Sequence, residues 1–130
     1  AHSRMDELCA NYLEYMLNDD EGGIHKPAAI IFEPIQGEGG VIPASKYWME
    51  RIRDIATQHN ILLIVDEVQC GFGRTGQYFG FQYGDIKPDI ICMSKAIGGS
   101  FPLSLIAYNK KYDEWQTGNH AGTFRGNSLA

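Results

Sequence analysis

Short apolar runs alternate with amphipathic segments along this chain of 130 residues. The runs at 28–32, 61–65 and 89–93 have the length of strands, and the central run consists entirely of branched aliphatic side chains. All-apolar runs of this kind are typical of strands that are buried on both faces of a sheet. Their alternation with helical segments predicts an α/β fold, built as a mostly parallel sheet with helices on both faces.

Two of the intervening segments have helical periodicity and recognisable ends. Ser3 is the predicted N-cap of the first helix, with Asp6 as its capping-box partner, and the glycines at 22–23 end it. Ser45 caps the second predicted helix, and Asn60 closes it just before the central strand. The apolar positions that recur at helical spacing are Met5, Leu8, Cys9, Tyr12, Met16 and Leu17 in the first, and Trp48, Ile52, Ile55 and Ala56 in the second.

A fourth strand is predicted at 103–108, with a short connection to the run that ends at Met93. Because this connection is short for a parallel crossover, we expect the fourth strand to run antiparallel to its neighbour. A short helix is expected around 110–115. The polar, glycine-broken segment 120–127 is expected to be a loop whose hydrogen-bond donors suit an anion.

Composition and charge narrow the class of protein. Hydrophobic content of 44% and charged content of 21% are typical of one globular domain. The net charge of −5 argues against nucleic-acid binding, and we expect neither a membrane span nor a secretory leader. Cys9, Cys70 and Cys92 are odd in number and lack the spacing of metal ligands, so we expect reduced thiols in a cytoplasmic protein.

Candidate chemistry lies at the ends of two predicted strands. The central strand runs into Asp66, and the strand at 89–93 runs into Ser94 and Lys95. If the two strands are parallel neighbours, both side chains emerge at the edge where open α/β sheets bind ligands. An acid and an amine that converge suit pyridoxal phosphate, which forms a Schiff base with a lysine and pairs its pyridinium nitrogen with an acid. Taken singly, Lys95 could be an ordinary solvated charge and Asp66 a cap or surface acid.

Two glycine-rich loops have alternative interpretations. The loop at 36–40 either turns tightly or approaches a ligand closely, or it is a flexible connector, and Glu38 within it is a candidate site residue. Residues 71–76 (GFGRTG) match the GxGxxG pattern of dinucleotide sites. The residues 66–70 separate them from the strand, however, and aromatic residues rather than a helix start follow them. We therefore interpret this match as fortuitous.

Together, the motifs resemble the class III pyridoxal-phosphate-dependent aminotransferases. They are residues 33–40 (EPIQGEGG), 66–69 (DEVQ), 71–76 (GFGRTG), 94–99 (SKAIGG) and 122–123 (GT). The resemblance covers nearly all of the chain beyond the first predicted helix. Within the class, residues 120–127 look most like diaminobutyrate–2-oxoglutarate aminotransferases, with the ornithine and 4-aminobutyrate types next. The resemblance implies fold type I, with residues 1–130 forming part of the cofactor-binding large domain, without its upstream phosphate loop and the C-terminal small domain.

The resemblance also implies two catalytic residues. Lys95 corresponds to the Schiff-base lysine, which shuttles a proton between the substrate and the cofactor. Asp66 corresponds to the acid that keeps the pyridinium nitrogen protonated. Arg74 and Arg125 are expected to be structural or interface residues, and no metal site is expected.

Four further positions receive implied roles. Val68 corresponds to a residue under the cofactor ring, and Gln69 to one near the phenolic oxygen of the ring. Thr123 corresponds to a phosphate contact that is donated across a homodimer. Glu38 matches a substrate-side acid that pairs with an active-site arginine outside this chain.

The predicted activity of the intact parent protein is transamination between the terminal amine of a diamino acid, such as 2,4-diaminobutyrate, and 2-oxoglutarate. Its partners are then amino-acid and 2-oxo-acid substrates and a second copy of the enzyme. The alternative enzyme is an ω-aminotransferase of the ornithine or 4-aminobutyrate type. The chain alone is expected to be inactive, and it could instead be a non-catalytic domain that self-associates through uncovered sheet edges.

Overall fold

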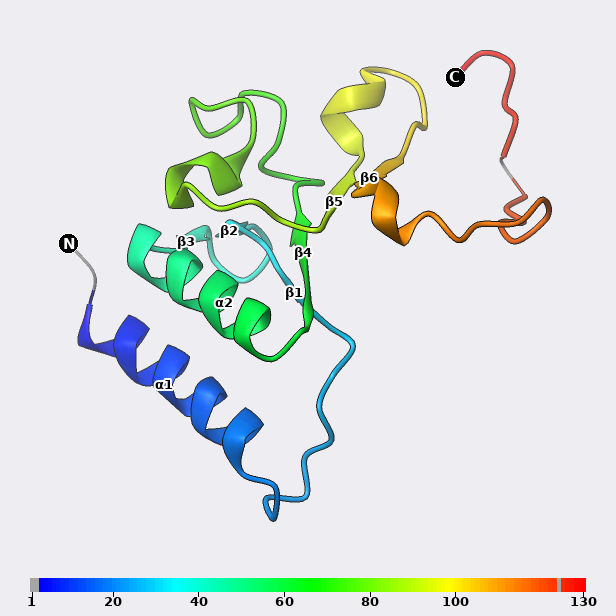
Figure 1. Cartoon of the computed structure of the whole chain (residues 1–130). Helices are drawn as coiled ribbons and strands as arrows, with labels where there is room; N and C mark the ends of the chain where they lie inside the picture. Colours follow the sequence, from blue (N-terminus) through cyan, green and yellow to red (C-terminus); the bar gives the residue numbers. More distant parts are fainter. Residues whose placement is uncertain (1–2, 124) are drawn as a thin grey trace.

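A four-stranded sheet forms the centre of the molecule, and its strands are, in spatial order, β1 (Ala29–Phe32), β4 (Leu62–Asp66), β5 (Ile90–Met93) and β6 (Leu105–Tyr108) (Figure 1). The computed structural model describes residues 3–123 and 125–130. β1 pairs with β4 and β4 with β5 in parallel, whereas β5 and β6 are antiparallel. The parallel sheet and its antiparallel fourth strand are therefore confirmed.

The first helix, α1 (Arg4–Asn18), begins with the expected capping box. The Ser3 hydroxyl accepts a hydrogen bond from the backbone nitrogen of Asp6, and the Asp6 carboxylate accepts one from the backbone nitrogen of Ser3. Two of the otherwise unpaired donors at the helix start are satisfied in this way, which fixes where the helix begins.

The second helix, α2 (Lys46–Gln58), is also bounded as the sequence predicts. The Ser45 hydroxyl accepts a hydrogen bond of 3.1 Å from the backbone nitrogen of Trp48. At the other end, Asn60 adopts a left-handed conformation with φ of 53°, and the Ile61 nitrogen donates to the Ala56 carbonyl at 2.8 Å. Such an ending turns the chain directly into β4.

The core lies between α2 and one face of the sheet. Leu63 and Val65 of β4 are fully buried against α2, and Ala10 of α1 belongs to the same cluster. Both α-helices therefore lie on one side of the sheet, with α1 alongside α2 (Figure 1). On the opposite side, no α-helix covers the sheet within the described residues, and Ile31 is 60% exposed. The α/β class is confirmed, and one of the two expected helical layers is present in this part of the chain.

Several short elements differ from the expectation. The loop at 36–40 closes a small hairpin between β2 (Ile35–Gln36) and β3 (Ile42–Pro43). The helix expected around 110–115 is a single 3-10 turn, η3 (Lys110–Tyr112), which Asn109 caps. No helix follows the GFGRTG segment directly: turns lead from it to the 3-10 helix η1 (Gly80–Gly84), which agrees with the interpretation that the match is fortuitous.

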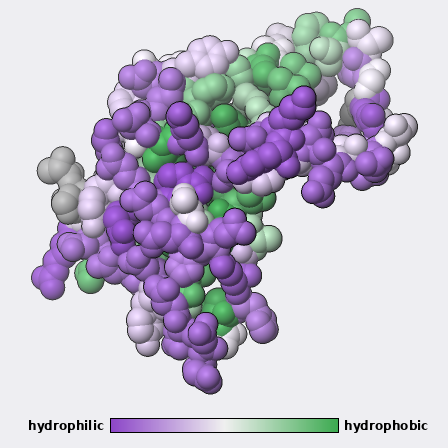
Figure 2. All heavy atoms as spheres, viewed as in Figure 1, coloured by the Kyte–Doolittle hydropathy of each residue, from purple (hydrophilic) through white to green (hydrophobic). Residues whose placement is uncertain are grey.

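Apolar atoms gather on the surface around the 3-10 helix η2 (Lys95–Gly98) and the loop that follows it (Figure 2). Phe101, Leu105 and Ile106 are each about half exposed, at 51%, 46% and 59%. Among the described residues, no helix is both long enough and apolar enough to span a bilayer.

Candidate functional site

Asp66 and Lys95 emerge at the same edge of the sheet. β4 and β5 are parallel neighbours, and their register pairs Asp66 with Cys92, three positions before Lys95. The backbone nitrogen of Glu67 continues this pairing with a hydrogen bond of 2.9 Å to the Cys92 carbonyl. The two strands are thus parallel neighbours, which is the condition that the sequence set for both side chains to emerge at one edge of the sheet.

Lys95 begins η2 and has a left-handed backbone conformation with φ of 47°. Left-handed conformations are costly for residues other than glycine, and they cluster at functional sites. The turn is held in place because the Ser94 hydroxyl donates a hydrogen bond of 3.1 Å to the Leu103 carbonyl. The exposed Lys95 side chain lines a hollow of about 350 Å³. We call it the Lys95 hollow; its lining residues are Val68, Gln69, Arg74, Lys95 and Ala96.

Asp66 lines a second, larger hollow of about 680 Å³ beside Glu33 and Trp48. Its Oδ1 accepts a hydrogen bond of 2.9 Å from the backbone nitrogen of Val68, which orients the carboxylate and begins a turn. Val68 lines the Lys95 hollow, so this hydrogen bond links a residue of one hollow to a residue of the other. Burial and, to a smaller extent, the negative charge of Asp66 raise the pKa of the Cys92 thiol.

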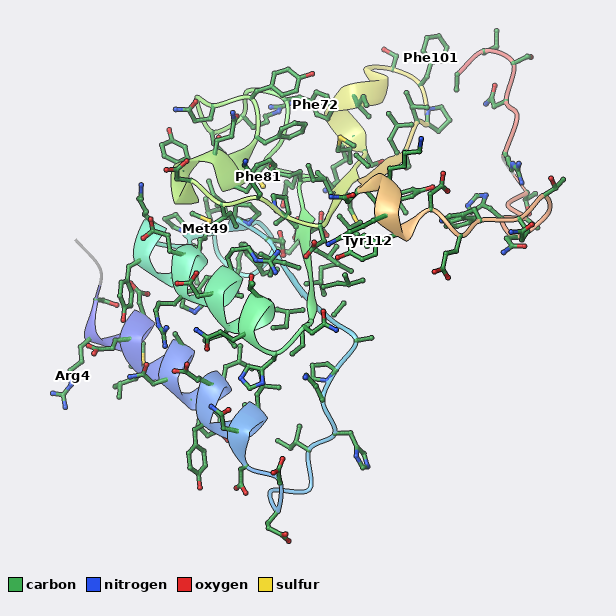
Figure 3. The ribbon with its side chains drawn as sticks, viewed as in Figure 1. Arg4, Met49, Phe72, Phe81, Phe101 and Tyr112 are labelled. Atoms are coloured by element: carbon green, nitrogen blue, oxygen red, sulfur yellow. The ribbon has the colours of Figure 1, made fainter. Side chains whose placement is uncertain are left out.

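Glu67, which directly follows Asp66 in the sequence, has a fully buried side chain. It accepts backbone hydrogen bonds of 2.9 Å from Gly80 and from Phe81, and a hydrogen bond of 3.3 Å from the Cys70 thiol. Burial, followed by the charge of Glu67 and this hydrogen bond, raises the pKa of Cys70 to about 12. Figure 3 shows Phe81, a residue of η1, close to Met49 in the first turn of α2.

Gln69 brings the loop at 36–40 to the Lys95 hollow. Its side chain lies against Gly37, whose backbone nitrogen donates a hydrogen bond of 3.0 Å to the Glu33 carboxylate. The loop is therefore attached to the end of β1 and touches a residue at the end of β4. This contact could not be predicted from the sequence, because nothing in the spacing of the two segments marks it.

The remaining two candidates lie apart from these hollows. Glu38 and Thr123 are exposed, and neither lines the Lys95 hollow or the Asp66 hollow. Thr123 belongs to the exposed segment 120–127, of which residue 124 lies outside the described residues.

The sequence matches a model of the family described as Aminotransferase class-III over residues 2–130. The chain belongs to the class III aminotransferases. It is 54% identical over 123 residues to the diaminobutyrate–2-oxoglutarate aminotransferase of Rhizobium meliloti (strain 1021), and 53% identical over 119 residues to that of Haemophilus influenzae. These matches cover 95% and 92% of this chain but 26% of each relative.

Solved structures of an ornithine aminotransferase and of a transaminase are similar to this chain. The ornithine aminotransferase of Plasmodium yoelii matches with a TM-score of 0.77 and 36% identity, over 88% of this chain and 30% of that one. A transaminase from the marine bacterium Virgibacillus matches with a TM-score of 0.76 and 31% identity, over 92% of this chain and 28% of that one. The class III chain therefore spans less than a third of the length of these relatives.

Two residues of this class III chain contribute to the site in ways that the sequence did not predict. Arg74, expected to be structural or an interface residue, lines the Lys95 hollow. Glu67, which had no expected role, is the buried acceptor that holds the following loop. The sequence does show a second acid directly after Asp66. It does not show that this acid is buried, because the partners of Glu67 are backbone amides that no motif marks.

Proposed function

We propose that the full-length protein containing this chain is a pyridoxal-phosphate-dependent aminotransferase. It exchanges the terminal amine of a diamino acid, with 2,4-diaminobutyrate as the preferred donor, with 2-oxoglutarate. The observation that carries the proposal is the placement of Asp66 and Lys95 at the same edge of neighbouring parallel strands. The names of the relatives, at 54% and 53% identity, favour diaminobutyrate as the donor.

The residues present fit this cofactor. Lys95 has an exposed side chain in a hollow that also contains the polar Gln69. Asp66 uses Oδ1 to accept from Val68, while Oδ2 receives no hydrogen bond from the part of the chain that the structure describes. Oδ2 is therefore available to accept from a pyridinium nitrogen.

When bound, pyridoxal phosphate supplies an aldehyde that takes up amino groups and a ring that accepts electrons. Lys95 would attach the cofactor and then move a proton to and from the carbon that bears the transferred amine. Only the neutral amine could attack the aldehyde or accept the proton, and the ammonium that forms would then return the proton. Asp66 would hold the proton on the ring nitrogen. Val68 would contact the ring, and Gln69 the phenolic oxygen.

Further parts of the proposal concern the whole protein. Thr123 would donate a hydrogen bond to the cofactor phosphate of a partner in a homodimer, and Glu38 would pair with a substrate-side arginine elsewhere in the protein. Residues 1–130 would be part of the large domain. The exposed Ile31 and Ile106 support burial of this sheet by further protein. Free Cys9, Cys70 and Cys92 support a cytoplasmic location.

There are two alternatives to this function: a different amino donor, and a non-catalytic role for the isolated chain. The match to the Plasmodium yoelii ornithine aminotransferase, with a TM-score of 0.77, supports ornithine as the next donor to test. For the chain in isolation, the exposed apolar side chains of β6 support a non-catalytic domain that self-associates.

The test combines labelling and turnover. The full-length protein is incubated with pyridoxal phosphate, reduced with borohydride and mapped by peptide mass. We expect the adduct on Lys95 and not on the exposed Lys110 or Lys111, which serve as internal controls. We also expect glutamate to form from 2,4-diaminobutyrate and 2-oxoglutarate faster than from ornithine. An unlabelled Lys95 would refute the cofactor assignment, and faster turnover of ornithine would refute the choice of donor.

A further inference from the structure

Ser94 and Ser104 form a cross-strand pair just beyond the last paired residues of β5 and β6. The antiparallel register of these strands ends with Met93 opposite Leu105, and one further step along both strands places Ser94 opposite Ser104. Their hydroxyl oxygens lie 2.8 Å apart, which is a hydrogen-bond distance. The pair therefore extends the pairing of β5 and β6 by one position, directly beside Lys95.

The direction of this hydrogen bond follows from the single proton of each hydroxyl group. The Ser94 hydroxyl lies 3.1 Å from the Leu103 carbonyl oxygen, which can only accept. Because Ser94 donates its proton there, it must accept in the pair with Ser104, and Ser104 must donate. A chain of two hydrogen bonds thus runs from Ser104 through Ser94 to Leu103.

The backbone of Lys95 requires support from its neighbours. Its φ of 47° lies in the left-handed region, which is unfavourable for a lysine. Ser94, directly before it, is extended, and its carbonyl accepts a hydrogen bond of 3.3 Å from the Ile97 nitrogen. The two hydrogen bonds of the Ser94 hydroxyl are shorter than this backbone bond. They are therefore the closer restraints on the residue that precedes Lys95.

The hydroxyl pair also joins the two ends of the loop that carries Lys95. Residues 94–104 connect β5 to β6. Within this loop, Gly98 approaches Leu103 so closely that a Cβ atom on the glycine would lie 3.1 Å from the Leu103 Cβ. The loop therefore folds back on itself, and its ends meet at the two serines.

We propose that Ser94 and Ser104 are positioning residues for Lys95. Their hydrogen bonds hold the end of β5 against the start of β6, and this fixes the point and the direction in which the Lys95 side chain leaves the backbone. Both hydroxyls act on the backbone beside Lys95 rather than on its flexible side chain. That the amine of Lys95 then attaches pyridoxal phosphate rests on the proposed function.

The test compares Ser94→Ala, Ser104→Ala, their double variant and Ser104→Thr in the full-length protein. Ser104→Thr keeps a hydroxyl at an exposed position just before β6. Ser100→Ala is the matched control, because Ser100 is exposed in the same loop and its hydroxyl makes no hydrogen bond within the described residues. The readouts are amide hydrogen exchange of the loop without cofactor, the rate at which pyridoxal phosphate attaches to Lys95, and the pH titration of its absorption band.

Ser94→Ala should speed exchange of the loop amides and slow attachment at Lys95 roughly 2- to 10-fold, as for one lost hydrogen bond. Ser104→Ala removes one of the two hydrogen bonds of Ser94, so its effect should be smaller, about 1.5- to 5-fold. The double variant should match Ser94→Ala, because Ser104 has no acceptor once the Ser94 hydroxyl is gone. The absorption band should titrate at a shifted pH in all three alanine variants, and Ser104→Thr should restore wild-type values.

A double variant worse than Ser94→Ala, or alanine variants that behave like Ser100→Ala, would overturn the inference. Faster exchange with unchanged attachment and titration would also overturn it, since the serines would then stabilise the loop without positioning Lys95. If the wild-type protein attaches no pyridoxal phosphate at Lys95, the proposed function fails. Crystal structures then decide the inference alone: a displaced Lys95 backbone in Ser94→Ala supports it, and an unmoved one refutes it.

Discussion

The carboxylate of Glu67 accepts a hydrogen bond of 2.9 Å from the backbone nitrogen of Gly80, across the whole loop that carries Arg74. Its other oxygen accepts from the nitrogen of Phe81, also at 2.9 Å. Because Glu67 directly follows β4, this buried acid attaches the far end of the loop to the strand that carries Asp66. The position of Arg74 in the Lys95 hollow therefore depends on a residue that does not line it.

Replacing Glu67 by glutamine should destabilise the protein by about 1–3 kcal/mol, since either the buried amide of Gly80 or the partly buried amide of Phe81 loses its acceptor. The glutamine side chain keeps the size of glutamate but has a single acceptor oxygen. Urea denaturation measures the change in the free energy of unfolding. Glu38→Gln, at an exposed position, is the control and should change little. Equal stabilities of the two variants would contradict the role of Glu67.

Cys70 should resist alkylation in the native protein. Burial, then the charge of Glu67 and its hydrogen bond, raise the pKa of the Cys70 thiol to about 12, so little reactive thiolate is present at pH 8. Cys9 is exposed and should react with iodoacetamide first, whereas both thiols should react equally in denaturant. Mass spectrometry of timed samples measures this order. Native Cys70 reacting as fast as Cys9 would be inconsistent with its buried place beside Glu67.

Asp89 should make stability depend on pH in the acid range. Burial alone would raise the pKa of Asp89. Hydrogen bonds from Arg53 at 2.8 Å and from the Leu63 nitrogen at 2.9 Å nevertheless hold its pKa below the ordinary value. A folded-state pKa below that of the unfolded chain stabilises the protein at pH values above the unfolded pKa, and this contribution is lost as pH falls below about 4.

The measurement is the free energy of unfolding between pH 7 and pH 3. The wild-type protein should lose more stability over this range than Asp89→Asn, which has no carboxylate to protonate. Asp54→Asn, at an exposed position on α2, should follow the wild-type curve. Parallel curves for wild type and Asp89→Asn would show that Asp89 makes no such contribution.

Features that depend on neighbouring residues were predictable from the sequence. Ser3 and Ser45 begin the two helices as expected, because each hydroxyl accepts a hydrogen bond from a backbone nitrogen of the first turn. Asn60 ends the second helix as expected, because it adopts a left-handed conformation. The apolar runs gave the parallel strands, and the short connection before β6 gave its antiparallel direction.

Features that depend on approach across the fold were not predictable. The β2–β3 hairpin consists of two-residue strands, too short for an alternating pattern, and its turn places Val41 at φ of 57°. The partners of Glu67 are backbone amides of a later loop, and every residue has such an amide. Gln69 lies beside Gly37 only because the folded chain brings these two segments together.

The roles of Asp66 and Lys95 can be separated by activity in the full-length protein. Asp66→Asn retains an Oδ1 that can accept from the Val68 nitrogen, so the local turn should persist. In place of Oδ2 it presents an NH₂ group, which cannot accept from a pyridinium nitrogen. We expect kcat to fall about 10- to 100-fold, the effect of losing one charge-assisted hydrogen bond.

Lys95→Ala removes the group that moves the proton, and kcat should fall further, by about 10²- to 10⁴-fold. Lys87→Ala, at an exposed lysine just before β5, should retain wild-type kcat and serves as the control. Steady-state glutamate formation from 2,4-diaminobutyrate and 2-oxoglutarate measures all three variants. If Asp66→Asn turned over at the wild-type rate, the Asp66 carboxylate would have no role in the reaction. If Lys95→Ala did so, Lys95 would not be the residue that moves the proton.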